Sequence, residues 1–134
     1  MRVFIDSNIP MYAAGRAHPH REPSIRFLRR VQSGEVEGCT STEVLQEILY
    51  RYSALRRRDV AVQVYDLFVE MCPVVFDVTL ADTDAARTLL LEVETISARD
   101  AVHAAVMRNH EVERIASYDT GFDDVPGVKR FPLE

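Results

Sequence analysis

The chain has 134 residues, of which 47% are hydrophobic and 28% charged, and its formal net charge is -5. These values are typical of a folded domain with a hydrophobic core, so we expect one domain over residues 1–134. The apolar stretches fall far short of the roughly 20 residues that cross a membrane. The N-terminus also lacks the long apolar segment of a signal peptide, so we expect a cytoplasmic protein without membrane association.

The net charge, the arginine content and the two cysteines further limit the class of protein. A net negative charge argues against nucleic-acid binding by bulk attraction. All of the 16 basic residues except Lys129 are arginine, however, and arginine binds phosphate through two parallel hydrogen bonds. Cys39 and Cys72 lie among apolar neighbours, and a small disulfide-rich domain would carry more cysteines, so we expect buried free thiols.

The first half of the chain predicts two strands and three helical segments. Residues 2–5 form an apolar, β-prone run that ends at Asp6, which indicates a buried strand with a carboxylate at its carboxyl end. A helical turn over residues 9–15, a loop over residues 18–23 and a helix from residue 24 to Gly34 are expected next. A second strand over residues 35–41 precedes a helix with one apolar stripe that reaches about residue 55.

The second half continues the alternation of strands and helices. A helix is expected over residues 59–71, and a third strand over residues 73–79 has Pro73 at its first position. Helices over residues 81–93 and 97–109 precede the segment "RIASYDTGF", in which apolar residues lead into Asp119. The tail, residues 128–134, is compatible with an edge strand. This alternation predicts a parallel sheet that helices cover on both faces.

Two of these strands end in an aspartate, Asp6 and Asp119, at the sheet edge where open α/β sheets bind ligands. Two carboxylates about 4 Å apart repel by about 4 kcal/mol at an effective dielectric near 20, so a cluster needs a cation or a shared proton. Mg²⁺ meets this need, because it takes oxygen ligands and serves phosphate chemistry. A single such aspartate often only caps the next helix, and Asp6 could do so. Because the same arrangement occurs at Asp6 and again at Asp119, a functional site is favoured over a helix cap.

Two helices carry further acids. Thr40 or Ser41 offers an N-cap for the first of them, and with Thr40 in that place Glu43 completes a capping box, which is a sufficient structural role. Glu47 lies in mid-helix beside the apolar stripe and is the preferred site residue, a partly exposed glutamate being the alternative. Asp100 stands three residues after Ser97 in another capping-box pattern, so taken alone it is interpreted as structural.

The four acids stand, in chain order, in "FIDSNIPMY", "STEVLQEILYRY", "ARDAVHAAVM" and "IASYDTGFDDVPGVKRF". Their order and surroundings resemble the PIN-domain family, in particular the VapC-like toxins of toxin–antitoxin modules, over nearly the whole chain. The resemblance implies a three-layer α/β/α sandwich with a short, mostly parallel central sheet. It also implies a metal-dependent endoribonuclease that uses Mg²⁺, or Mn²⁺ as a substitute, and that acts as the toxin of a pair with a cognate antitoxin. The resemblance further implies a homodimer.

Residue by residue, the resemblance assigns the site. The catalytic positions would be Asp6, Glu47, Asp100 and Asp119, with Asp6, Asp100 and Asp119 as the metal ligands and Asn8 and Ser117 in support through hydrogen bonds. Ser7 stands where threonine is common in the family, and "SYD" stands where "TND" is common, which puts the contacts around Asp119 in question. All four acids are present, which disfavours an inactive member. The helices after the second strand carry aromatic and aliphatic side chains that are mostly expected in the core: Tyr50, Tyr52, Tyr65, Leu67 and Phe68. Any of them that is exposed would suit the dimer or antitoxin surfaces.

Other functions fit less well. A haloacid-dehalogenase-like phosphatase needs a second aspartate where this chain has Asn8, and a receiver domain needs a late lysine, for which Lys129 is poorly placed. The remaining alternative is a catalytically idle PIN-fold module that binds RNA or protein. The number of carboxylates permits either one or two metal ions.

Three basic features have two interpretations each. Residues 56–58, all arginine, could bind an RNA backbone, although a solvated helix end that complements the helix dipole is the simpler interpretation. His18 and His20 have a spacing that suits a metal but lack a third ligand nearby. His103 lies one turn after Asp100 and is interpreted as a helix residue near the cleft rather than a general base.

Overall fold

The computed structural model describes residues 2–134. A five-stranded sheet has the order β3-β2-β1-β4-β5, and every neighbouring pair is parallel. The strands are β1 (Arg2–Ile5), β2 (Glu37–Ser41), β3 (Val74–Phe76), β4 (Arg114–Ala116) and β5 (Lys129–Arg130). The expected edge strand in the tail is thus present as β5, beside β4.

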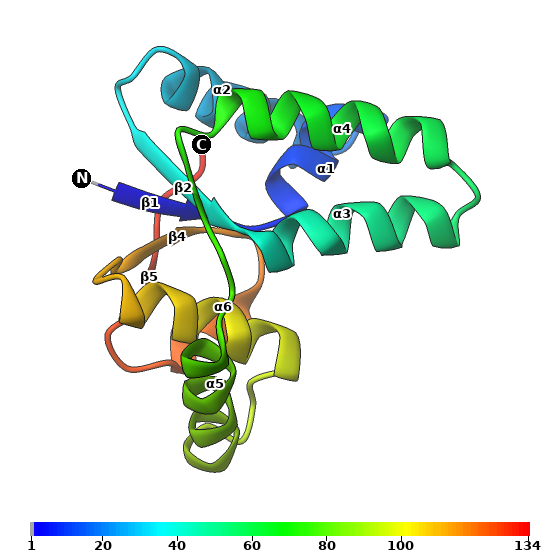
Figure 1. Ribbon diagram of the computed structural model, residues 1–134. Coiled ribbons are helices and arrows are strands. Elements are labelled where there is room, and N and C mark those ends of the chain that lie inside the picture. Colours follow the sequence, from blue (N-terminus) through cyan, green and yellow to red (C-terminus); the bar gives the residue numbers. More distant parts are fainter. Residues whose placement is uncertain (1) are drawn as a thin grey trace.

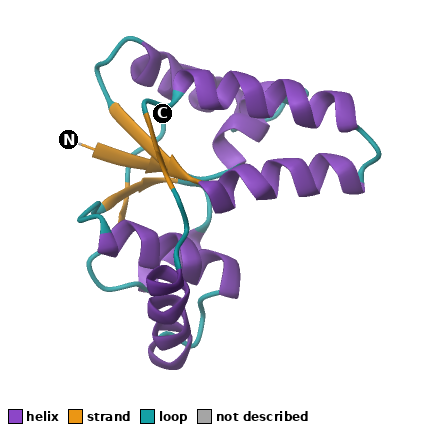
Figure 2. Cartoon of the chain, in the orientation of Figure 1, coloured by secondary structure: helices purple, strands orange, loops and turns teal. Residues whose placement is uncertain are grey.

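Helices cover both faces of this sheet (Figures 1 and 2). They are α1 (Asn8–Ala14), α2 (Arg21–Gln32), α3 (Thr42–Ala54), α4 (Arg58–Met71), α5 (Leu80–Glu92) and α6 (Ala98–Asn109), with a short 3₁₀ helix η1 (Thr120–Asp124). Figure 1 shows α1, α2 and α4 on one side of the sheet and α5 and α6 on the other. The helix α3 runs outward from the sheet edge and packs against α4. The predicted α/β/α sandwich is confirmed.

The central strand β1 determines where the site lies. Val3, Phe4 and Ile5 are fully buried, as expected for a strand covered by helices on both faces. Because β1 lies between β2 and β4, with Ile5 opposite Ala116, the carboxyl ends of these strands meet at one edge of the sheet. The residues that follow them therefore lie close together.

The loop expected over residues 18–23 is shorter than predicted, because α2 already begins at Arg21. Pro23 lies in the first turn of this helix, where backbone N–H groups have no partner within the helix, so the missing donor costs nothing there. The predicted strand over residues 73–79 is also too long. β3 pairs only with β2 and ends where β2 ends, with Phe76 opposite Ser41.

The capping box predicted for α3 is wrong by one residue. The N-cap is Ser41, whose Oγ accepts a hydrogen bond from the backbone N of Val44 at 3.4 Å. Thr40 belongs to β2 and donates its hydroxyl to the carbonyl of Ile5 at 3.0 Å. Glu43 is therefore not at the position that a capping box requires.

The three consecutive arginines do not form the last turn of a helix. α3 ends at Ala54, Arg56 has a positive φ of 58°, and Arg58 begins α4. The three arginines are exposed, as expected of a solvated helix end, but Arg57 and Arg58 lie at the start of α4, where a cation does not complement the helix dipole. Cys39 and Cys72 are buried free thiols, as predicted. Within residues 2–134, none of the helices combines the length and the apolar character that crossing a membrane requires.

Candidate active site

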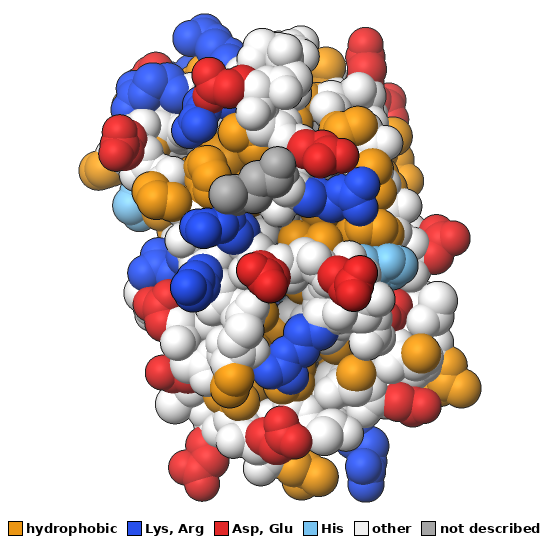
Figure 3. All heavy atoms as spheres, turned by 90° about the vertical axis from the view of Figure 1, so that its left-hand side faces the viewer, with side chains coloured by type: hydrophobic (Ala, Val, Ile, Leu, Met, Phe, Trp, Pro, Cys, Tyr) orange, Lys and Arg blue, Asp and Glu red, His pale blue; other side chains and the backbone are white. Residues whose placement is uncertain are grey.

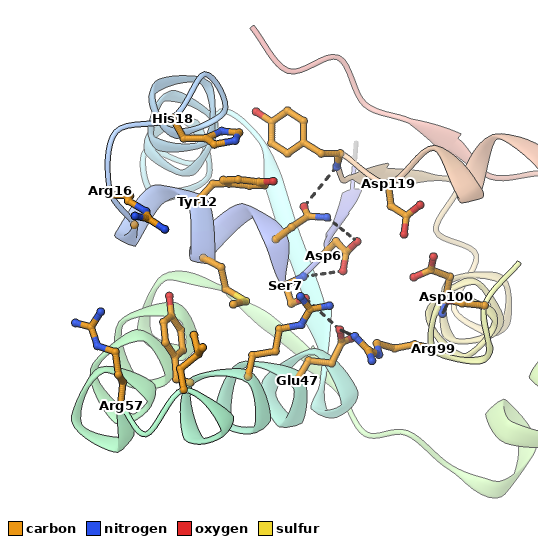
Figure 4. Close-up of a pocket in the computed structure, with 18 of the residues that line it drawn as sticks. Asp6, Ser7, Tyr12, Arg16, His18, Glu47, Arg57, Arg99, Asp100 and Asp119 are labelled. Carbon is orange, nitrogen blue, oxygen red and sulfur yellow. Dashed lines mark hydrogen bonds and ion pairs between the residues drawn. The ribbon is translucent and has the colours of Figure 1, made fainter.

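A cleft of about 1390 Å³ lies at the carboxyl edge of the sheet (Figure 4). It is larger than the roughly 300–1,000 Å³ of small-molecule pockets, so it has room for a segment of a polymer. The four acids that the sequence singles out all line it, from β1, α3, α6 and the segment between β4 and η1: Asp6, Glu47, Asp100 and Asp119.

Asp6 follows β1 directly and is 4% exposed. Its Oδ1 accepts a hydrogen bond from the backbone N of Ser7 at 2.7 Å, and its Oδ2 accepts from Ser117 Oγ at 2.6 Å. Burial raises the pKa of Asp6, although the charge of His103 and the hydrogen bond from Ser117 oppose that rise. The N-cap of α1 is Ser7, so Asp6 does not serve as the helix cap that was the alternative.

Asn8 and Ser117 connect the two strand ends through Asp6. Asn8 Nδ2 donates to Asp6 Oδ2 at 3.3 Å and to Ser117 Oγ at 3.2 Å. The backbone N of Asp119 donates to Ser117 Oγ at 3.0 Å. This network holds the aspartate after β1 and the aspartate after β4 in one arrangement, as drawn in part in Figure 4.

Glu47 is 4% exposed, and its two oxygens have different partners. Oε2 accepts from Ser7 Oγ at 3.2 Å and from Arg99 Nη1 at 3.5 Å. Oε1 is in hydrogen-bond contact with His103 Nε2, from α6. Of the two alternatives for Glu47, a partly exposed surface residue is thus excluded, because the side chain is buried and contacts three residues, Ser7 before α1 and Arg99 and His103 on α6.

His103 is fully buried, and its Nε2 also lies 3.8 Å from Asp6 Oδ1. Burial by itself lowers the pKa of an imidazole, but the hydrogen bond to Glu47 and the charge of Asp6 outweigh it, so the pKa of His103 is raised. Sequence reasoning placed His103 near the cleft but did not find its contact with Glu47. The available signal was its spacing of three from Asp100, which puts both residues on one side of α6.

Asp100 and Asp119 form a coupled pair of carboxyl groups. Burial, a hydrogen bond with Asp119 and the charge of Asp119 raise the pKa of Asp100 to about 7. The same hydrogen bond holds the pKa of Asp119 below its ordinary value. These opposite shifts favour the protonated form of Asp100 and the charged form of Asp119. Ser97 Oγ caps α6 by accepting from the backbone N of Asp100 at 3.1 Å, which leaves the Asp100 carboxyl to face the cleft.

Two sets of these side chains are candidates for holding a cation. Ligand atoms of Asp6, Glu47 and His103 lie within 4.8 Å of one another. His103 Nε2 is, however, engaged with the Glu47 carboxylate, and a ring nitrogen that donates a hydrogen bond does not bind a metal. The carboxylates of Asp6, Asp100 and Asp119 offer only oxygen atoms and repel one another, as the raised pKa of Asp100 indicates. Carboxylate oxygens of this kind are the ligands that Mg²⁺ prefers in proteins.

Arginines line the cleft outside the acids. They come from the segment after α1, from α3, from the turn before α4 and from the start of α6: Arg16, Arg51, Arg57 and Arg99. Guanidinium groups bind phosphate through paired hydrogen bonds, so the cleft combines a cluster of carboxylates with side chains of a kind that binds phosphate. Arg57 is the member of the three-arginine cluster that reaches this cleft.

The parallel α/β sheet with four carboxylates at its carboxyl edge defines an α/β protein with an acidic centre that could hold a metal ion. The PIN domain profile matches residues 3–128, and the chain belongs to the PIN-domain family. Ribonuclease VapC13 of Mycobacterium tuberculosis is 43% identical over 128 residues, which cover 96% of this chain and 98% of that protein. Ribonuclease VapC23 of the same species is 35% identical over 120 residues, 87% of this chain and 92% of that protein.

Solved structures share the fold at lower identity. VapBC2 from Rickettsia felis, bound to a DNA fragment from its promoter, superposes with a TM-score of 0.78 at 18% identity and covers 100% of both chains. VapC20 from Mycobacterium tuberculosis, a toxin that cleaves the sarcin-ricin loop, has a TM-score of 0.72 at 18% identity, over 88% of this chain and 90% of that one. The resemblance to VapC-like PIN domains is therefore confirmed.

Proposed function

We propose that this chain is a metal-dependent endoribonuclease and the toxin of a toxin–antitoxin pair. The observation that carries the proposal is the convergence of Asp6, Asp100 and Asp119 in one arginine-lined cleft, with the pKa of Asp100 raised to about 7. Relatives that match most of the chain, at 43% and 35% identity, are ribonucleases. The catalytically idle binding module is disfavoured, because a site without catalysis has no need of such a cluster.

The carboxylates of Asp6, Asp100 and Asp119 would hold Mg²⁺, with Mn²⁺ as a substitute. The bound ion would polarise a phosphoryl oxygen and lower the pKa of a water molecule. Ser117 and Asn8 donate to Asp6 Oδ2 and thereby hold the carboxylate in one orientation. Preorganised ligands of this kind avoid reorganisation during the reaction.

Glu47 acts as the fourth catalytic acid in this proposal. His103 occupies its Oε1, so Oε2, which also contacts Ser7 and Arg99, is the oxygen available to a water molecule or a proton in the cleft. His103 is a positioning residue, because it is fully buried and reaches the cleft only through its contacts with Glu47 and Asp6. The arginines of the cleft would bind the phosphates on either side of the scissile bond.

The partner surfaces in this proposal lie on the helices that extend from the sheet. Exposed apolar side chains on α3 and α4 would contact an antitoxin or a second copy in a homodimer: Leu49, Tyr50, Val62, Leu67 and Val69. Exposed apolar groups on a small protein commonly mark partner surfaces. Tyr52 and Phe68, by contrast, are buried in the core. We place the action on RNA in the cytoplasm.

The nuclease is tested with the purified chain, free of any partner, and a mixed RNA pool in Mg²⁺, in Mn²⁺ and in EDTA. We expect cleavage with either metal ion and none in EDTA. Asp6→Asn should lower the rate of RNA cleavage by more than about 100-fold. Losing a residue that only hydrogen-bonds to a metal ligand costs at most about 100-fold, so a larger loss indicates a direct ligand. Asp84→Asn, an exposed acid on α5, is the matched control.

Two results would contradict the proposal. If Asp6→Asn and Asp100→Asn left RNA turnover unchanged, these acids would not carry catalysis. If the folded wild-type protein cleaved no RNA with either metal ion, the binding-module alternative would hold.

A further inference from the structure

A cluster of four rings lies beside the acidic centre. Tyr12 comes from α1, His18 and His20 precede α2, and Tyr118 lies between β4 and η1. The ring centroids of Tyr12 are 4.7 Å from His18 and 5.4 Å from Tyr118, and those of His20 and Tyr118 are 3.7 Å apart. The histidines that the sequence offered as a metal pair thus belong to an aromatic cluster.

The rings of this cluster differ in what they face. Tyr12, His18 and Tyr118 line the cleft together with the acids. His20 stacks on Tyr118 at an interplanar angle of 12°, and its carbonyl accepts the Tyr118 hydroxyl at 3.4 Å. His20 therefore supports Tyr118. His18 is exposed, and its Nδ1 accepts from the backbone N of His20 at 3.0 Å, which fixes its ring at the cleft.

The ring cluster is tied directly to the acids. Tyr118 immediately precedes Asp119 in the chain, and its backbone N donates to Asn8 Oδ1 at 3.4 Å. Asn8 in turn donates to Asp6. Figure 4 shows Tyr12, His18 and Arg16 at one end of the cleft and Asp119 at the other, with Asp6 between them. A ligand phosphate at the acids would thus have aromatic rings within reach of the attached nucleoside.

We propose that Tyr12, His18 and Tyr118 form a subsite that stacks one unpaired nucleobase of the RNA next to the cleaved phosphate. Aromatic rings bind bases of single-stranded nucleic acids by stacking, which tolerates any sequence because every base has a π-face. Bases within a duplex have both faces covered by their neighbours, so the subsite selects loops, bulges and single strands. Arg16 would neutralise a phosphate of the same strand. This inference rests on the proposed action on RNA.

The test measures binding in EDTA, which prevents cleavage. The probes are a fluorescent oligoadenylate decamer and an abasic ribose–phosphate decamer of the same length and charge, followed by fluorescence anisotropy. Wild-type protein should bind the oligoadenylate more tightly. His18→Ala should weaken oligoadenylate binding by about 5- to 150-fold and leave binding of the abasic strand unchanged, as expected for one lost stacking contact.

Two variants serve as controls. His18→Phe keeps a ring without the imidazole, so it should retain the preference for oligoadenylate. His110→Ala is the matched control, because His110 is also exposed and stacks on an aromatic ring, that of Phe76, at 3.9 Å, but outside the cleft. It should bind both decamers as the wild type does. Thermal unfolding verifies that each variant is folded.

The possible outcomes separate this inference from the nuclease itself. Equal losses on both decamers would mean that His18 contacts the backbone, and unchanged binding would mean that it contacts nothing, so either overturns the subsite. Failure of the wild type to prefer, or to bind, the oligoadenylate overturns it as well. If the RNA pool is nevertheless cleaved with metal, only the subsite fails. If the preference is found but the pool is not cleaved, only the nuclease fails.

Discussion

At the residue scale, the charges of the buried acids are balanced by a histidine. Glu47 and Asp6 are both 4% exposed, and His103 lies between them with its Nε2 on Glu47 and 3.8 Å from Asp6. The raised pKa of His103 favours its charged form beside these carboxylates, and the charge of His103 in turn opposes the rise that burial causes in the pKa of Asp6. Removing one member of a buried ion pair lowers the free energy of unfolding strongly, because the remaining charge is left without that partner in a low dielectric.

His103→Leu should therefore destabilise the protein by about 3–5 kcal/mol, because Glu47 keeps a buried charge without its partner. Adding Glu47→Gln should recover about 0.5–3 kcal/mol of that loss, since the neutral amide no longer needs a cation. Urea unfolding of the two single variants and the double variant in EDTA measures both effects. Strictly additive losses would show that the two side chains do not stabilise one another.

The raised pKa of Asp100 makes the metal-free protein sensitive to pH. Its folded pKa is about 7 and its ordinary value is 3.8, so between these values the folded state holds a proton that the unfolded state lacks. The contribution of this group to stability is present at acid pH and is lost as the pH rises toward about 7. The lowered pKa of Asp119 offsets part of the loss.

Asp100→Asn should thus be more stable than the wild type in EDTA at pH 8, by at least about 1 kcal/mol, and close to it at pH 4. Mg²⁺ should reduce the difference at pH 8, because it stabilises only the protein that binds it. Thermal unfolding in EDTA and in Mg²⁺ gives the comparison, with Asp84→Asn as the control acid. A difference independent of pH would contradict the assigned protonation of Asp100.

At the scale of elements, the start of each helix determines where its acid points. α3 begins after Ser41, the last residue of β2, so the strand and its helix meet without a loop and Glu47 lies about one and a half turns from the sheet edge. α6 begins after Ser97, which puts Asp100 in its first turn. The N-cap serines Ser41 and Ser97 therefore determine where Glu47 and Asp100 lie.

Ser41→Ala should destabilise the protein by about 1 kcal/mol, because the backbone N of Val44 loses its capping acceptor. Glu43→Ala should change stability by less than about 0.5 kcal/mol, since a capping box at Thr40 is not formed. Chemical denaturation of both variants distinguishes the two capping arrangements. A larger loss for Glu43→Ala than for Ser41→Ala would restore the cap predicted from the sequence.

At the scale of the whole molecule, the distribution of charge matters more than its sum. The net charge is -5, and on the side where β1 begins Figure 3 shows acidic and basic side chains interspersed. At the opposite, carboxyl edge of the sheet, the cleft brings arginines from distant segments together: Arg16, Arg51, Arg57 and Arg99. An acidic protein can thus present a local phosphate-binding surface.

RNA binding should accordingly depend on salt. Each phosphate contact on a single strand contributes about -0.7 to the slope of log affinity against log salt concentration. Arg57→Ala should therefore weaken binding and make the slope shallower by about 0.7, whereas Arg87→Ala, exposed on α5, should change neither. Anisotropy titrations of the decamer in EDTA at several salt concentrations measure the slope. Equal slopes for both variants would exclude Arg57 from the RNA path.

The local patterns in the sequence predicted the sheet and the positions of the helices well. Apolar runs that end in Asp6 and Asp119, and helical spacing around Glu47, report on burial within a few residues of chain, which is why they are readable without a structure. The elements themselves were predicted correctly, and the errors in them lay at boundaries. These are Arg21 and the start of α3, where a proline in a first turn and two adjacent hydroxyl residues each permit more than one interpretation, and the end of β3 and the helix ends on either side of the three arginines.

The sequence by itself determined the α/β alternation, the four acids and their order, because strand and helix periodicity is a local property of the chain. Only the tertiary structure decided which side chains meet. His103 pairs with Glu47 across 56 residues of sequence, and Tyr118 stacks on His20 across 98. Such contacts depend on strand order and on the direction of each helix. The packing of the whole core sets both, and no single segment encodes them.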